Sequence, residues 1–335
     1  MAQEEKDRKP IVAVPARDEA ERLPALINAL ACQTWILRTR QILPVVLVLN
    51  NCRDDTAGAL KTSAAQQPLL AIAVTDIAFP SDSAHVGSAR RLAMEEALRT
   101  VGPNSILLTT DADAVPAPNW IDANLAAIAN GADLVGGYIM GDHHEEALLG
   151  PGFLQRSTRY LHYARLVDQL SALVDPLPHD PWPRHSDHTG ASLAVRGEVY
   201  QAVGGLPPLP FGEDVAFVNA VCRAGYRLRH PLDVQVVVSA RLQGRATGGM
   251  ADCLKGWVDA AAQGLPHLVE DPVRVATRMR RRRVTRSSDG GVSMVNCVDD
   301  ISDDEASIKK EIDIELAIRR VKQMIAASQD ENRVT

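Results

Sequence analysis

Two aspartates separated by one residue, Asp111-Ala112-Asp113, offer the most direct chemistry in this sequence. They come immediately after the apolar run 106–110 and before the proline-containing segment 115–118. Neighbouring carboxylates repel each other unless a cation is close. Mg²⁺ and Mn²⁺ typically take one or two carboxylates and fill their other positions with water and substrate phosphate oxygens. The pair therefore indicates a divalent-cation site, and the alternative interpretation is a solvated acidic turn.

The elements around this pair predict a parallel sheet. The run 106–110 has the composition of a strand buried on both faces. Earlier in the chain, the apolar runs 11–14 and 45–49 each end in a polar loop and are followed by a helical pattern. Repeated strand–loop–helix units predict parallel strands with right-handed crossovers, and ligands bind outside the carboxyl ends of such strands.

Two later segments place charges where helices are expected to begin. Arg90 and Arg91 follow Gly87-Ser88, in a first turn that disfavours cations, so they indicate a nearby anion or else an exposed helix face. Glu213 and Asp214 follow a glycine and precede a helical pattern. Acidic residues are favourable there for the helix alone, so their position is compatible with either a structural or a chemical role.

The long connection 175–188 contains several prolines and histidines and predicts a lid or binding loop. Its histidine spacing fits no familiar zinc pattern. The small residues that begin the next strand, 190–196, are expected to allow close approach of a ligand. A later strand, 234–238, is followed by two cations, Arg241 and Arg245.

The composition is that of a globular protein. The chain has 335 residues, a net charge of −6 and 46% hydrophobic residues. The charged start and the lack of an 18-residue apolar stretch predict a cytoplasmic protein without a transmembrane segment. Five widely spaced cysteines indicate neither disulfides nor zinc, and the acidic balance gives no reason to expect nucleic acid. The arginines at 280–283 are interpreted as a solvated helix face.

The last part of the chain is expected to be separate. Residues 287–304 have the composition of a flexible linker. Apolar residues at helical spacing then predict an amphipathic helix over about 305–327. Its apolar stripe needs a partner, either the same chain or a second copy, so a homo-oligomer through this helix is one expectation.

Taken together, five motifs in this order resemble a family 2 glycosyltransferase with the GT-A fold. They are Val14-Pro15-Ala16-Arg17-Asp18-Glu19, Asn50-Asn51-Cys52-Arg53-Asp54-Asp55-Thr56, Gly87-Ser88-Ala89-Arg90, Asp111-Ala112-Asp113 and Gly212-Glu213-Asp214. The resemblance covers roughly Lys9 to Gly249. It implies an α/β fold with a Rossmann-like, mostly parallel central sheet flanked by helices, a helical and loop insertion, and a helical tail at the C-terminus.

The expected domain organisation follows from this resemblance and from the tail pattern. A disordered leader would occupy residues 1–9, and the glycosyltransferase domain would occupy 10–249. Within that domain, 142–189 would be an insertion that supplies an acceptor-site helix and loop. A helical extension would follow over 250–286, and the linker with its amphipathic helix would occupy 287–335.

The resemblance also implies roles for individual residues. The nucleotide of the donor would contact Pro15, Ala16, Arg17, Glu19, Asn50, Asn51, Arg90, Asp111 and Ala112. Asp113, with Asp111, would hold the metal, while Asp214 would be the catalytic base beside Glu213 on the acceptor side. By position alone, Arg241 and Arg245 are assigned to the leaving diphosphate, and His185, His188 and Trp182 to the acceptor.

The predicted function is metal-dependent transfer of a sugar from a nucleotide-diphosphate sugar, a UDP- or GDP-sugar, to a hydroxyl of a small or lipid-free acceptor, with inversion. Mn²⁺ or Mg²⁺ would be the cofactor. Alternatives are a retaining enzyme of the phosphoglycerate-acceptor type, a sugar-1-phosphate nucleotidyltransferase and a non-catalytic sugar-nucleotide-binding protein. The sequence lacks the Q-x-x-R-W motif and transmembrane helices of the family's processive synthases, so polymer synthesis coupled to export is not expected.

Overall fold

A seven-stranded sheet forms the centre of the protein. The computed structural model describes residues 8–244, 248–288 and 311–334. The strand order is β3-β2-β1-β4-β8-β6-β9, and β8 is antiparallel to both of its neighbours, while the other pairs are parallel. The strands are β1 (Lys9–Ala16), β2 (Leu43–Asn50), β3 (Leu70–Ile77), β4 (Ser105–Thr109), β6 (Leu134–Gly136), β8 (Leu193–Arg196) and β9 (Leu228–Arg229). The mostly parallel sheet flanked by helices confirms the predicted fold class.

Two smaller sheets accompany the central one. The first has the order β5-β10-β7, and the second pairs β11 with β12 in antiparallel fashion. Their strands are β5 (Val115–Pro116), β7 (Tyr138–Gly141), β10 (Gln235–Val238), β11 (Leu268–Glu270) and β12 (Glu311–Asp313). Gly137 separates β6 from β7, and a Cβ atom at this position would lie 2.0 Å from Ser192 Oγ. Consequently β6 joins the central sheet and β7 joins the smaller one.

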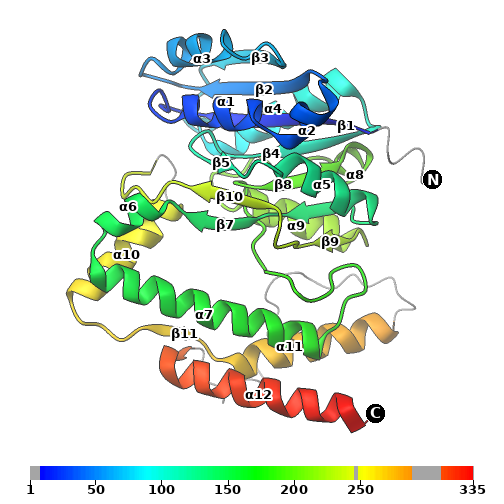
Figure 1. Ribbon diagram of the computed structural model, residues 1–335, viewed down its shortest axis with the longest axis vertical. Helices are drawn as coiled ribbons and strands as arrows, with labels where there is room; N and C mark the ends of the chain where they lie inside the picture. The colour runs from blue at the N-terminus through cyan, green and yellow to red at the C-terminus, as the bar shows by residue number, and fades with distance from the viewer. Residues whose placement is uncertain (1–7, 245–247, 289–310, 335) are drawn as a thin grey trace.

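Helices cover the sheet and form a further layer below it (Figure 1). Those around the sheet are α1 (Leu23–Ala31), α2 (Thr34–Thr39), α3 (Thr56–Ala64), α4 (Val86–Val101), α5 (Trp120–Ala129), α8 (Gly197–Ala202) and α9 (Glu213–Arg223). The others are α6 (His143–Leu148), α7 (Pro151–Val174), α10 (Met250–Ala262), α11 (Pro272–Ser288) and α12 (Ile314–Val334). Helices α6 and α7 are separated before Pro151, because Gly150 has a φ of 91° and proline favours the first turn of a new helix.

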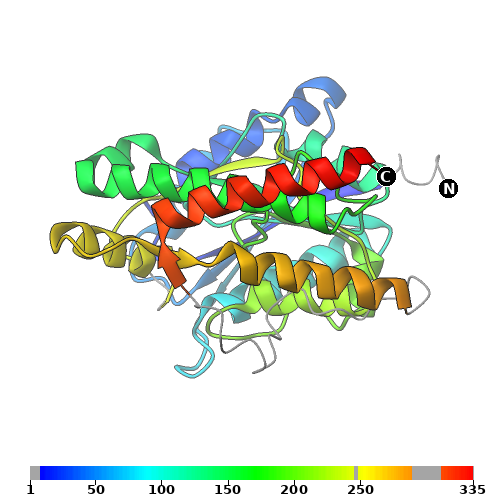
Figure 2. The same ribbon diagram turned by 90° about the horizontal axis from the view of Figure 1, so that it is seen from below.

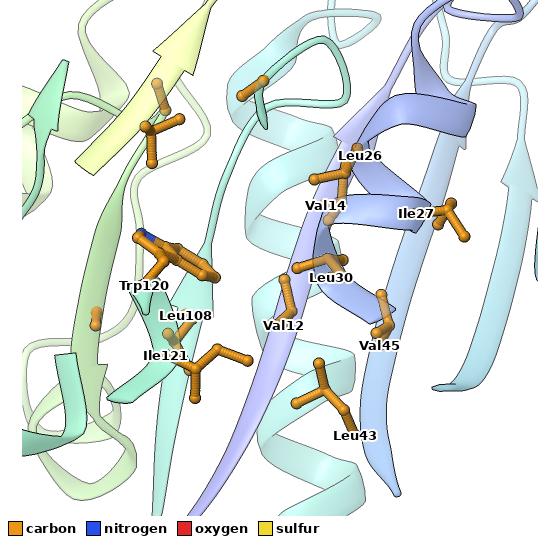
Figure 3. Close-up of a cluster of buried hydrophobic side chains, with 14 of the residues drawn as sticks. Val12, Val14, Leu26, Ile27, Leu30, Leu43, Val45, Leu108, Trp120 and Ile121 are labelled. Carbon is orange, nitrogen blue, oxygen red and sulfur yellow. The ribbon is translucent and has the colours of Figure 1, made fainter. Parts of the chain in front are cut away.

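Alternate residues of the central strands pack on opposite faces of the sheet. Val12 and Val14 of β1 belong to the core beneath α1, whereas Ile11 and Ala13 belong to the core beneath α4. Figure 3 shows the first of these cores, where Val12 and Val14 lie near Leu26 and Leu30 of α1. A strand buried on both faces is held firmly, so the loops at its carboxyl end have a fixed base.

The helical layer has its own core. Helices α7, α11 and α12 lie side by side, as Figures 1 and 2 show. Ile314, Ile318, Val321 and Ile325 of α12 are buried together with Leu170 and Val174 of α7 and Met279 of α11. The amphipathic helix predicted over 305–327 is thus present, although it begins at Ile314. Its apolar face is covered by the same chain, which removes the reason for expecting self-association through it.

Two segments differ from the expected organisation. Lys9 already belongs to β1, and Arg8 forms an ion pair with Glu198 over 2.6 Å, while the rest of the expected leader, residues 1–7, lies outside the described residues. The expected linker over 287–304 falls largely outside the described residues. None of the described helices is long and apolar enough to cross a bilayer.

Candidate active site

The two aspartates lie directly beyond β4, as the sequence predicted. Thr109 is the last residue of the strand, and a turn follows in which the Ala114 amide donates to the Asp111 carbonyl over 3.2 Å. The Asp111 side chain is 35% exposed and that of Asp113 is 20% exposed. Ala112 is buried between them. Both carboxylates are therefore held at the carboxyl end of a central strand while remaining partly accessible.

Arg90 connects these aspartates to a second pair of carboxylates. Its guanidinium donates to Asp111 Oδ1 over 2.6 Å, to Glu213 Oε1 over 3.2 Å and to the Gly190 carbonyl over 2.7 Å. The side chain is 3% exposed. The nearby anion that Arg90 was expected to have is thus supplied by the protein itself. The buried guanidinium fixes the positions of the Asp111 and Glu213 carboxylates. The adjacent Arg91 instead forms a surface pair with Glu95.

Glu213 and Asp214 occupy the first turn of α9. Glu213 is buried, and this burial raises its pKa, although Arg90 beside it acts in the opposite direction. The half-buried Asp214 accepts from the Gly190 amide over 2.7 Å through Oδ2, and from the Val215 amide over 2.7 Å through Oδ1. Both Asp214 oxygens therefore have fixed positions, and each still has a free acceptor direction.

Gly190 allows these groups to come together. A Cβ atom at this position would lie 2.5 Å from Arg90 Cζ. The small residues before β8 were expected to admit a ligand, but at Gly190 the group that approaches is the Arg90 guanidinium. Through its carbonyl and its amide, Gly190 joins Arg90 to Asp214. The loop before β8, the end of β4 and the start of α9 are consequently connected at one point.

Arg241, which follows β10, contributes a cation to the site. It pairs with Asp113 over 3.0 Å and donates to both oxygens of Glu19, over 2.8 Å to Oε2. Burial and the nearby carboxylates of Asp111 and Glu19 raise the pKa of Asp113, and with Arg241 opposing them the pKa is about 6. A carboxylate with such neighbours gains stability from an additional cation.

Glu145 is a residue that sequence reasoning missed. Its carboxylate pairs with Arg22 over 2.6 Å and accepts from the Ser239 hydroxyl and the Ala240 amide, over 2.9 and 2.7 Å. These bonds lower its pKa, although partial burial opposes them. Because Ser239 and Ala240 immediately precede Arg241, Glu145 fixes the backbone that carries this arginine. Its place in a helical pattern gave no signal of this role.

The loops after β1 and β2 hold the residues assigned to the nucleotide. Arg17 donates to the Ala84 carbonyl over 2.8 Å, and Asn51 exchanges two bonds of 3.0 Å with the backbone of Phe79. These two side chains therefore brace neighbouring loops. Asn50 is different: its amide nitrogen donates to the His85 carbonyl over 3.2 Å, but its buried Oδ1 atom has no partner in the described part of the chain. An unpaired buried acceptor of this kind is costly unless a donor arrives.

A third group of possible ligands lies in the same loops. Asp18, Cys52 and Asp54 offer ligand atoms within 4.8 Å of one another. The carboxylates already have partners, because Asp18 accepts from the Arg53 amide over 2.6 Å and Asp54 accepts from the Ala20 amide over 3.0 Å. Burial raises the pKa of the Cys52 thiol, which favours its protonated form. These hydrogen bonds explain why the three side chains lie together: they hold the loop after β1 against the loop after β2.

A large cavity lies between the central domain and the helical layer. Its volume is about 1160 Å³. One part of its wall is apolar and includes Phe153, Tyr160, Leu254 and Trp257. Another part is charged and is contributed by α11 and the loop 175–189. Thr189, next to Gly190, and Ser239-Ala240, next to Arg241, also line it. The cavity is therefore adjacent to the carboxylate site.

Histidines from the long loop form a connected group at this cavity. His188 Nδ1 lies 3.3 Å from His230 Nε2, and His230 Nδ1 lies 3.0 Å from Asp180 Oδ2. Burial lowers the pKa of His185 to about 3 and that of His188 to about 4, with the nearby His230 acting in the same direction. Both predicted residues thus line the cavity as neutral rings. His230 and Asp180, which were not singled out from sequence, hold them.

Comparison with protein families agrees with this arrangement. Residues 11–170 match the model described as "Glycosyl transferase family 2". This segment contains β1, β2, β4 and both aspartates. Over this segment the chain is similar to glycosyl transferase family 2.

Solved structures similar to this glycosyltransferase include other sugar-transferring enzymes. A mannosyltransferase from Pyrobaculum calidifontis, in complex with GDP-Man and Mn²⁺, is 17% identical, with 99% of this chain and 77% of that chain covered and a TM-score of 0.49. S. aureus TarS residues 1–349 in complex with UDP is 14% identical, with coverages of 84% and 72% and a TM-score of 0.49. None of the curated proteins compared with the chain matches it.

A third solved structure is glucosyl-3-phosphoglycerate synthase from Mycobacterium tuberculosis in complex with Mn²⁺, UDP and glucosyl-3-phosphoglycerate. It is 15% identical, with 79% of this chain and 83% of that chain covered and a TM-score of 0.41.

The predicted site residues of the glycosyltransferase fall into three groups. The structure brings together the carboxylates with Arg90, Arg241 and Glu19 at the ends of β1, β4 and β10. It places His185 and His188 at the adjacent cavity. Trp182 is not among the residues that line this cavity; it is 40% exposed, and the Arg165 guanidinium lies 6.0 Å from the centre of its ring. Arg245 lies outside the described residues.

Proposed function

We propose that this glycosyltransferase moves a sugar from a nucleotide-diphosphate sugar, a UDP- or GDP-sugar, to a hydroxyl of an acceptor, with inversion and with Mn²⁺ or Mg²⁺ as cofactor. One observation carries the proposal. Asp111 and Asp113 at the end of β4 stand opposite Glu213 and Asp214 at the start of α9, and the buried Arg90 joins the two pairs. A transfer reaction of this kind needs one group of charges for the donor and another for the acceptor hydroxyl.

The residues present fit a divalent cation. Asp111 and Asp113 are partly accessible, and burial together with the neighbouring carboxylates of Asp111 and Glu19 raises the pKa of Asp113. Two carboxylates suit a hard cation that completes its coordination with phosphate oxygens and water. When bound, the cation would polarise the diphosphate and offset the negative charge that develops on it.

Arg241 is assigned to the leaving group. It lies within ion-pair distance of Asp113 and Glu19, so its guanidinium is already at the edge of the aspartate site. As the bond between the anomeric carbon and the β-phosphate oxygen breaks, the electron pair stays with that oxygen. A guanidinium held there stabilises this charge through a charge-assisted hydrogen bond.

Asp214 is assigned as the base. The acceptor oxygen forms its bond to the anomeric carbon while its proton passes to an Asp214 carboxylate oxygen. The Gly190 and Val215 amides hold both oxygens of Asp214 in place, which limits the rotation that would otherwise weaken the transfer. Glu213, in contrast, is buried against Arg90 and has a structural role in orienting that guanidinium.

Donor binding tests the metal part of the proposal. Calorimetry of UDP- and GDP-sugars should show binding that weakens sharply when a chelator removes Mn²⁺ and in Asp113→Asn. Asp82→Asn, at an exposed aspartate outside the site, is the control and should bind as the parent does. Equal affinity with and without divalent ion would show that the aspartates do not hold a metal.

The product tests the stereochemical part. NMR of the transferred sugar should show an anomeric configuration opposite to that of the donor. Retention would exclude Asp214 as the base of a direct displacement and would favour the retaining alternative.

A further inference from the structure

A row of arginines on α11 faces the cavity. Arg278, Arg282 and Arg286 are spaced four residues apart, which places them on one side of the helix at intervals of about 6 Å. All three line the cavity, together with Val275 and Met279 from the same side. This part of α11 was expected to be a solvated helix face, and the structure shows that the expectation is wrong for Arg282.

The two outer arginines have acidic partners within the protein. Arg278 donates to both oxygens of Glu270, over 2.8 and 3.1 Å. Arg286 is bonded to both oxygens of Asp175, over 3.3 Å to Oδ2. Their charges are thus neutralised, and each connects α11 to a neighbouring segment.

Arg282, between them, has no carboxylate partner among the described residues. Its one hydrogen bond is a contact of 3.8 Å from Nη1 to the Met279 sulfur, which is weak. Its Nε atom is buried and unpaired. A guanidinium has five N–H donors, and a buried donor without an acceptor costs free energy. Arg282 therefore has capacity for an anion that no described side chain supplies.

Several other charged groups at this cavity have partners within the protein. Arg184 pairs with Asp180 over 3.0 Å, and the Arg165 guanidinium lies over the Trp182 ring. Of the acids that have no arginine partner, Asp168 accepts from the Ser186 hydroxyl and Asp187 accepts from the Ile139 amide over 3.3 Å. Arg227 also lines the cavity but is exposed to solvent, so Arg282 is the half-buried arginine of this lining that lacks a charged partner among the described residues.

We propose that Arg282 binds an anionic group of the acceptor, a phosphate monoester or a carboxylate, while the acceptor's hydroxyl lies toward Gly190 and Asp214. The inference rests on the proposed function, because it requires the acceptor to occupy this cavity. His188 and Thr189, which immediately precede Gly190 in the chain, line the same cavity as Arg282. The acceptor would thus be an acidic molecule that also carries a hydroxyl, and the apolar wall beyond would pack against its carbon skeleton.

Binding of matched probes tests this site. Glycerol 3-phosphate and glycerate carry the two candidate anions on a hydroxylated carbon chain, and glycerol is their uncharged counterpart. We expect calorimetry to show that the parent binds the first two and not glycerol. Hydrogen bonds to charged groups contribute about 1.5–3 kcal/mol, so Arg282→Gln should weaken binding of the anionic probes about 10- to 100-fold. Arg282→Lys should recover part of the affinity.

Arg280→Gln is the matched control. It removes the same charge from the same helix, but Arg280 is exposed and does not line the cavity. Its affinity for the anionic probes should equal that of the parent, and donor affinity should be unchanged in all three variants. Phosphatidylcholine vesicles that contain a polyprenyl phosphate form a second arm. If only the vesicles bind in a way that depends on Arg282, the anion belongs to a lipid headgroup. If only the soluble probes do so, the anion belongs to a small acceptor.

Equal binding of both kinds of probe by parent and Arg282→Gln would overturn the inference. Normal donor binding in that case would leave the proposed transferase function intact. If instead no nucleotide sugar binds to the parent, the proposed function itself fails, so the two failures are distinguishable.

Discussion

The ion pairs of Arg90 predict a large loss of stability when that residue is replaced. In Arg90→Met, the Glu213 carboxylate, 6% exposed, loses the cation that pairs with it among the described residues, and Asp111 loses a bond of 2.6 Å. Removal of one partner from a buried ion pair typically costs about 3–5 kcal/mol, because the other charge remains buried and uncompensated. We expect a decrease of that size in the free energy of unfolding, measured by urea denaturation with linear extrapolation.

Arg91→Met is the matched control for this experiment. Arg91 is the next residue of α4, and its pair with Glu95 has side chains that are 36% and 39% exposed. Surface pairs contribute up to about 1 kcal/mol, so this variant should remain close to the parent. If Arg90→Met does not fold, Arg90→Lys provides a milder perturbation, and its loss of stability should still exceed that of Arg91→Lys.

A double-mutant cycle decides whether the pair is responsible. Glu213→Gln removes the buried charge, so the double variant should lose less than the sum of the two single variants, by about 0.5–3 kcal/mol. Additive losses, or a cost for Arg90→Met no greater than that for Arg91→Met, would refute the assignment of Arg90 as the residue that holds the two carboxylate pairs together.

Three further predictions concern other parts of the molecule. Asp214→Asn should lower the rate of sugar transfer about 10²- to 10⁴-fold with little change in donor affinity, and Glu213→Gln should lower the rate less, as measured by product formation under saturating donor; a parent-like rate in Asp214→Asn would exclude it as the base. Burial raises the pKa of Asp168 to about 6 from 3.8, so its contribution to stability is present below pH 4 and is lost as the pH rises through about 6. Asp168→Asn should therefore gain stability relative to the parent between pH 4 and pH 8, by up to about 3 kcal/mol, and a difference that does not vary with pH would contradict this. Ile314→Ala, in the buried face of α12, should lower the free energy of unfolding by about 2–5 kcal/mol. Leu316→Ala, at a residue that is 40% exposed, should lower it little. Equal effects of the two variants in urea denaturation would show that α12 is not packed on α7.

The sequence predicts the central domain well because its signals are local. A run such as 45–49 indicates a buried strand by composition alone, and a polar loop at its end follows from the chain direction. The order of motifs then places Asp111 and Asp214 at the same edge of the sheet. These inferences need no knowledge of side-chain contacts.

Contacts between distant segments could not be predicted in this way. The bond from Arg90 to Glu213 joins residues 123 positions apart, and the one from Arg241 to Glu19 joins residues 222 apart. Glu145 looks like any other acidic residue of a helix until its partners are known. For Arg282 a signal did exist, namely the spacing of four residues between arginines 278, 282 and 286, but the same spacing also fits an exposed face.

The packing of α12 on α7 has a consequence for the order in which the protein is completed during synthesis. Roughly 140 residues separate the end of α7 at Val174 from the start of α12 at Ile314, and translation of such a length takes on the order of 10 s. Through this interval α7 has an apolar face that its later partner has not yet covered. The strands that carry Asp111 and Asp113 come from the first half of the chain and are able to form early, whereas the core shared by α7, α11 and α12 is completed only when α12 emerges. Nascent chains of intermediate length should therefore bind a chaperone that recognises exposed apolar helices.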